Sequence, residues 1–154
     1  MSGPNFQLIT ELQTLTRRDF SLTTPALLEP FSANPLVDGE FLELDANYKL
    51  ARGAGEGVSP LAFPVHTERG RSDIQAVGKA NVLMLGMYEA ETAVFDATGI
   101  VLGAPLTVQD VTFQALTRKG LKLEGATAGR VIVGFVSKIL TGKVRFVHFG
   151  NQKR

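Results

Sequence analysis

The sequence predicts an all-β protein, a small jelly-roll-like β-barrel or sandwich that follows an extended N-terminal arm. Three observations lead to this fold class. Short apolar segments recur through the second half of the chain, and glycine-containing turns separate them at intervals of about 8–12 residues. Four of the seven prolines fall within the first 35 residues. The length of 154 residues fits one domain.

The first segment, residues 1–35, is expected to be the arm. Proline fixes its own φ and pushes the preceding residue toward extended geometry, which favours a chain laid along a surface. Apolar residues also recur at every third position from Phe6 to Leu15, a spacing that fits a short helix over residues 5–13. Threonines within that stretch disfavour a helix. A short helix and a bent extended arm therefore both remain open.

The arm is unusually apolar for a chain terminus, which argues against a disordered tail. It packs either on its own barrel or on a neighbouring subunit, and we expect the second case to use apolar anchors. The candidate anchors are Phe6, Ile9, Leu12 and Phe20. A second candidate contact is Arg69 and Arg71 in the polar loop 67–75, because arginine pairs well with carboxylates on a partner.

The remaining residues, 36–154, are expected to form the barrel or sandwich. The segment 80–85 shows little apolar–polar alternation and is predicted to be buried on both faces. Pro64 indicates an edge strand. Strands are expected at 41–44, 48–50, 61–66, 80–85, 88–95, 106–108, 112–115, 121–123, 130–137 and 143–149.

Residues for catalysis or metal binding are sparse. The chain has no cysteine, and its two histidines, His66 and His148, have no metal-ligand spacing. The sequence around Ser59 is not G-x-S-x-G, and the glycine-rich loop 53–57 lacks the G-K-[ST] of a phosphate-binding loop. We therefore expect no enzyme, no metal and no cofactor.

Charge and hydropathy also limit the function classes. The net charge of +1 argues against a nucleic-acid coat. The basic stretch of Arg118 and Lys119 is interpreted as a solvated turn, and Glu89 with Glu91 as a solvated strand face. The longest apolar run is far shorter than the roughly 20 residues that span a bilayer, so no membrane role is expected.

Segments between residues 80 and 147 resemble the small β-rich head decoration, or cement, proteins of tailed bacteriophages. The resemblance lies in a pattern of strands and turns and covers about two-thirds of the chain, without a reactive residue to carry over. Residues 39–44 look like the opening strand of that family. The other segments that carry the resemblance are 82–86, 91–99, 103–108, 133–136 and 142–147.

The resemblance implies a virion protein, made in the host cytoplasm, that binds the outer surface of the capsid. It would clamp neighbouring major capsid subunits and associate with itself as a dimer or trimer. Clamping requires apolar contact area and extended backbone rather than catalysis. Two other functions remain open: another virion component, in the tail or head–tail connector, and a small-ligand-binding β-barrel.

Overall fold

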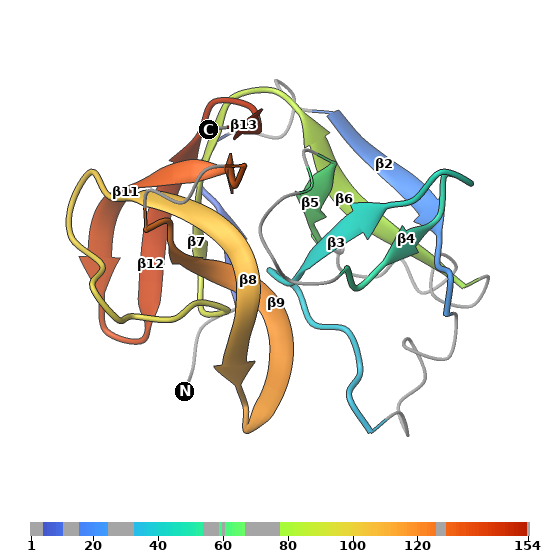
Figure 1. The fold of residues 1–154 in the computed structure, drawn as a ribbon, viewed down its shortest axis with the longest axis horizontal. Helices are drawn as coiled ribbons and strands as arrows, with labels where there is room; N and C mark the ends of the chain where they lie inside the picture. The colour runs from blue at the N-terminus through green and yellow to red at the C-terminus, as the bar shows by residue number, and fades with distance from the viewer. Residues whose placement is uncertain are drawn as a thin grey trace.

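The computed structural model describes residues 5–10, 16–24, 33–53, 59, 61–66, 78–125 and 129–153. Within that part of the chain every regular element is a β-strand, which confirms the all-β prediction. The strands gather into two lobes that lie side by side (Figure 1). We call them the large lobe and the small lobe.

The large lobe is a six-stranded antiparallel sheet with the order β1-β7-β12-β11-β8-β9. The sheet curls until β9 reaches the segment that follows β7. There the Leu121 amide donates to the Val94 carbonyl at 3.0 Å, and the Asp96 amide donates to the Leu121 carbonyl at 2.9 Å. Its strands are β1 (Phe6–Leu8), β7 (Tyr88–Thr92), β8 (Pro105–Phe113), β9 (Leu116–Leu123), β11 (Gly134–Leu140) and β12 (Lys143–His148).

The small lobe combines the pair β2-β6 with the three-stranded sheet β4-β3-β5. Isolated bridges join these two pieces on both sides, Val65 with Val82 and Leu22 with Leu50, so the small lobe also curls. Its strands are β2 (Thr16–Ser21), β3 (Phe41–Leu44), β4 (Leu50–Ala51), β5 (Ala62–Pro64) and β6 (Lys79–Leu85). A further short pair, β10 (Val131–Ile132) with β13 (Gln152–Lys153), lies near the C-terminus.

Each lobe has its own hydrophobic core, and strands β3, β5 and β6 separate the two cores. Successive side chains of a strand point to opposite faces, so neighbours on these strands enter different cores. The pairs that divide in this way are Phe41 and Leu42, Ala62 and Phe63, and Leu83 and Val82, with the first of each pair in the large-lobe core. The predicted two-sided burial of residues 80–85 is confirmed at Val82 and Leu83.

The N-terminal strands belong to the lobes. β1 pairs with β7 in the large lobe, and β2 pairs with β6 in the small lobe. The short helix considered for residues 5–13 is wrong at Phe6–Leu8, which form β1; residues 11–15 lie outside the described part of the chain. A separate arm over residues 1–35 and the jelly-roll connectivity both remain predictions.

Most of the predicted strands have different bounds in the structure, and two of them contain a turn or an interruption. The strand expected at 112–115 is wrong at Gln114 and Ala115, which adopt positive φ values of 53° and 61° and turn β8 directly into β9; residues 112–113 are the end of β8. The expected strand 130–137 is interrupted at Val133 between β10 and β11. The strand predicted at 41–44 is confirmed with the same bounds as β3.

Candidate functional site

The predicted arm anchors lie apart in the structure. Phe6 is only 4% exposed and belongs to the large-lobe core, whereas Phe20 is 6% exposed and belongs to the small-lobe core. Among the described anchors, Ile9 is the exposed one, at 38%. Leu12, Arg69 and Arg71 lie outside the described residues. The described anchors therefore do not form one surface.

Phe6 occupies a slot in its own chain. Its ring lies 5.5 Å from that of His66, and the backbone of Gly39 runs close beside it. A Cβ added at Gly39 would lie 2.8 Å from Oγ1 of Thr92 and 3.2 Å from Cβ of Phe6, and the φ of Gly39 is +89°. Glycine therefore fits this position both for conformation and for space. Burial of the Phe6 ring contributes about 1.5–3 kcal/mol.

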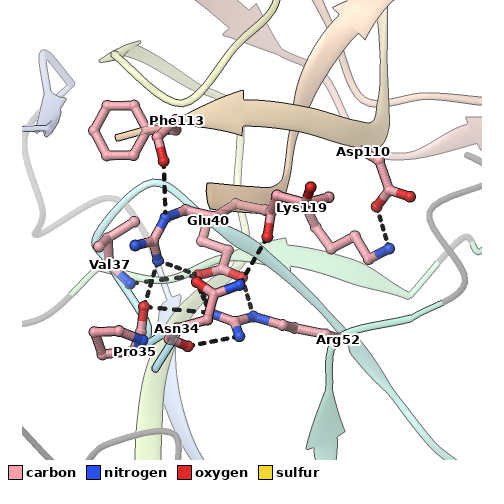
Figure 2. A network of polar contacts seen from close by, with 10 residues as sticks. Asn34, Pro35, Val37, Glu40, Arg52, Asp110, Phe113 and Lys119 are labelled. Carbon is pink, nitrogen blue, oxygen red and sulfur yellow. Dashed lines mark hydrogen bonds and ion pairs between the residues drawn. The ribbon is translucent and has the colours of Figure 1, made fainter. Parts of the chain in front are cut away.

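A network of charged groups lies where the two lobes meet (Figure 2). Glu40, which directly precedes β3, is fully buried. Both Nε and Nη2 of Arg52 donate to its carboxylate, and Nη1 of Arg118 on β9 lies 3.8 Å from its Oε2. We call Glu40, Arg52 and Arg118, together with Asn34 and Pro35, the buried clamp.

The clamp holds the segment that leads into β3. Arg52 donates from Nη1 to the Asn34 carbonyl at 2.8 Å, and both arginines donate to the Pro35 carbonyl. The Asn34 side chain donates to the Thr117 carbonyl of β9 at 2.9 Å. The clamp thus ties residues 34–35 to elements of both lobes. The clamp holds the backbone in position, because backbone carbonyls and one carboxylate accept most of the hydrogen bonds that the two arginines donate.

The interpretation of Arg118 as part of a solvated turn is wrong. Arg118 is 2% exposed, its Nε donates to the Phe113 carbonyl at 3.4 Å, and its guanidinium lies over the Phe113 ring. Burial lowers the pKa of Arg118, whereas the charge of Glu40 acts in the opposite direction. A buried arginine requires a carboxylate and satisfied donors, and the clamp supplies both.

The solvated face assigned to Glu89 and Glu91 is also wrong at Glu91. That residue is 8% exposed, and Nη2 of Arg145 donates to its Oε1 at 2.5 Å across the β7–β12 ladder. Glu89 is half-buried and accepts a hydrogen bond from the Ser137 hydroxyl at 2.8 Å. Both carboxylates bind side chains of their own sheet.

An apolar pocket of about 430 Å³ opens beside the β6–β7 turn. Three large apolar residues on its lining are exposed: Leu61 at 46%, Met87 at 67% and Phe149 at 53%. Solitary exposed apolar residues are ordinary, but a group around one hollow marks a surface suited to binding. The pocket is lined by Leu61, Phe63, Met84, Gly86, Met87, His148, Phe149, Gly150 and Asn151.

His148 forms the polar wall of this pocket. Its ring stacks on Tyr88 with centroids 4.6 Å apart, Nδ1 lies 3.3 Å from the Gly86 carbonyl, and Nε2 lies 3.0 Å from Oδ1 of Asn151. Asn151 in turn donates to the Ala62 carbonyl at 2.9 Å, which fixes its oxygen toward the histidine. Both ring nitrogens therefore face acceptors. Burial lowers the pKa of His148, and these two hydrogen bonds partly oppose that effect.

Tyr88, beneath His148, is buried, and burial raises its pKa. Its hydroxyl has no hydrogen-bond partner among the residues that the structure describes. Across the same described part of the chain, no group of three or more His, Asp or Glu side chains is placed to hold a metal ion. The lining of the pocket combines apolar side chains with one polar wall at His148 and Asn151.

Sequence reasoning missed both the clamp and the pocket. Glu40, Arg52 and Arg118 are far apart in the sequence, and no spacing pattern relates them. The pocket left a weak signal: Met87 and Phe149 each stand beside a glycine, Gly86 and Gly150, at a turn. Large apolar residues next to turn glycines have few core positions to enter, so they indicate exposed apolar surface.

In comparisons with protein-family models, with curated proteins and with solved structures, none matches this chain. Among the described residues, no helix is long and apolar enough to span a membrane.

Proposed function

We propose that this chain is a structural virion protein that binds the outer surface of a bacteriophage capsid and clamps neighbouring major capsid subunits. The group of exposed apolar side chains around the pocket carries this proposal. Leu61, Met87 and Phe149 present apolar surface to solvent although two complete cores already exist in the molecule. Such a surface gains free energy when a partner covers it.

The fold supports a role that depends on contact. The two curled lobes bury their own cores, and the clamp fixes the lobes to each other through Glu40 and Arg118. A rigid body loses less entropy on docking than a flexible chain does. Weak identical contacts repeated over a shell add up through multivalency. The resemblance of the strand and turn pattern to capsid cement proteins supplies the kind of partner.

Self-association as a dimer or trimer and an N-terminal segment that reaches a neighbour belong to the same proposal. Ile9 is the described anchor residue with an exposed side chain, so it is the member of the predicted set that is available for such a contact. Major capsid protein is the proposed second partner. The proposed location is the outer surface of the virion.

Imaging of shells with and without the protein tests this function and separates it from a tail or connector role. The proposal expects additional density on the outer face of the shell, repeated with the shell's symmetry. Density confined to the tail or to one vertex would assign the protein to the tail or connector instead. Shells from an unrelated phage, treated in the same way, are the control.

A small-ligand-binding protein is the second candidate, and the pocket favours it. Its volume of about 430 Å³ lies within the range of ligand sites, and its lining is apolar with polar groups at His148 and Asn151. Titration with an environment-sensitive apolar dye tests this candidate. Saturable binding that Phe149→Ser abolishes, together with no association with shells, would make ligand binding the better account.

A further inference from the structure

We propose that β1 is an exchangeable strand, so that the slot on β7 which holds β1 in one chain accepts β1 of a second copy. This deepens the proposed function by naming the partner of the N-terminal segment. Strand exchange in solution does not depend on the proposed function; its effect on shell binding does.

The attachment of β1 is small and lies at a sheet edge. β1 has three residues and, among the described strands, pairs with β7 alone, with Phe6, Gln7 and Leu8 opposite Thr92, Glu91 and Ala90. Backbone hydrogen bonds flank the ladder, from Ile9 to the Glu89 carbonyl and from Ala93 to the Asn5 carbonyl. Because the strand stands at the edge, it can leave without breaking any other pair in the sheet.

The slot selects the strand through Phe6. The ring packs beside Gly39, Thr92 and His66. Because Gly39 has no side chain, the slot is wide enough for the Phe6 ring. When β1 leaves, the slot and the edge of β7 are exposed together. A copy of the same strand offers the same side chain and the same backbone groups. Exchange therefore replaces each contact with an identical contact, as in domain swapping.

The connection to β2 restricts which copy can donate. β1 is in the large lobe and β2 in the small lobe, and only the residues from Ile9 to Leu15 separate the two strands. Thr10 and Thr16 are six residues apart, so a fully extended chain between them spans about 20 Å. A donated β1 must come from a copy whose β2 begins within about that distance of the acceptor's β7. Exchange thus requires close packing of copies, as in an oligomer or on a shell.

The absence of cysteine from the chain permits a direct test. One chain carries Gln7→Cys and a second chain of distinguishable size carries Glu91→Cys, and the two are mixed and oxidised. Facing residues in an antiparallel ladder lie about 4.5–5.5 Å apart, within disulfide reach. If β1 exchanges, disulfide-linked heterodimer forms about tenfold or more above a control mixture, because the ladder holds the two thiols at high effective concentration.

The control replaces Glu91→Cys with Tyr48→Cys, an exposed position at 73% on the small lobe, which reports chance collision. Leu8→Cys with Ala90→Cys is a second facing pair, in case loss of the Glu91–Arg145 contact affects folding. Heterodimer at no more than the control level for both pairs, over all protein concentrations, would overturn the proposal. In that outcome the double variant Q7C/E91C would close only within one chain.

Measurements of shell binding distinguish a failure of strand exchange from a failure of the proposed capsid-binding function. The chain locked by an internal Q7C/E91C disulfide should bind shells about tenfold or more weakly than its reduced form if exchange operates on the shell. Equal binding by the locked and reduced forms would contradict exchange there. If the unmodified chain fails to bind shells while heterodimer still forms in solution, the proposed function fails and strand exchange stands.

Discussion

Nη1 of Arg118 lies 3.8 Å from Oε2 of Glu40, and the two side chains are 2% and 0% exposed. The strand β9 of the large lobe thus meets the start of β3 of the small lobe through a buried charge pair. Arg52 donates to the same carboxylate, so two guanidinium groups share it, and Arg52 also holds the carbonyls of Asn34 and Pro35. This contact joins the two lobes.

Glu40→Gln should destabilise the protein by about 3–5 kcal/mol, because it leaves the buried Arg118 without its carboxylate. The free energy of unfolding in urea measures the effect. Lys122→Met is the matched control: it removes an ion pair with Asp96 at 3.9 Å whose side chains are 41% and 33% exposed. Such a surface pair contributes about 0–1 kcal/mol. Similar small losses in both variants would show that the clamp does not stabilise the fold.

Gly120→Ala should destabilise the large lobe where its sheet curls back on itself. An added Cβ would lie 2.4 Å from the Val94 carbonyl oxygen and 2.6 Å from Cγ2 of Val111, so the backbone must shift. The expected cost is about 1–3 kcal/mol in urea or thermal unfolding. Gly125→Ala is the control, since no atom of the described residues lies within 4 Å of its added Cβ. A cost at Gly120 no greater than that at Gly125 would argue against this close approach.

His148 should make stability depend on pH. Burial lowers its pKa below 6.5 in the folded state, so the unfolded chain binds a proton more readily. The stability that neutral His148 provides is complete above pH 6.5 and is lost as the pH falls toward the lowered folded pKa. Urea unfolding at several pH values measures it in the native protein and in His148→Gln.

The difference between these two proteins isolates His148, because His66 and the carboxylates are common to both. The account expects the native protein to lose more stability than His148→Gln as the solution is acidified below pH 6.5. Parallel stability curves, or a native protein that gains relative to the variant, would contradict the lowered pKa.

The anchor residues should separate folding from binding. Phe6→Ala should cost about 3–5 kcal/mol of stability, because its ring fills a slot in the core. Ile9→Ser should cost less, about 1–2 kcal/mol, because its side chain is already 38% exposed. Under the proposed function it should nevertheless weaken binding to shells. Unchanged shell binding by Ile9→Ser would remove Ile9 from the contact.

The sequence predicted local patterns better than it predicted long-range pairing. The alternation of apolar and acidic residues in β3 and the apolar run 82–85 of β6 are visible along the chain, and both strands were predicted. The turn at Gln114 and Ala115 was missed because tight hairpins with two positive φ values usually carry Asn-Gly or Asp-Gly. Gln114 and Ala115 are not residues that typically adopt this conformation, so the sequence does not predict the turn.

The candidate sites depended on contacts between distant segments. Phe6 looked like a free anchor because its sequence position near the N-terminus says nothing of a slot formed by Gly39 and Thr92. Arg118 looked solvated because it adjoins Lys119, whereas on β9 these neighbours point to opposite faces. Lys119 pairs with Asp110, and Arg118 turns inward to Glu40.

Sedimentation of the protein with empty shells of its proposed source phage tests the central claim most directly. The account predicts co-sedimentation that saturates at a fixed copy number per shell and is absent with shells of an unrelated phage. Protein that remains in the supernatant at every concentration, with intact shells in the pellet, would contradict a capsid-binding function.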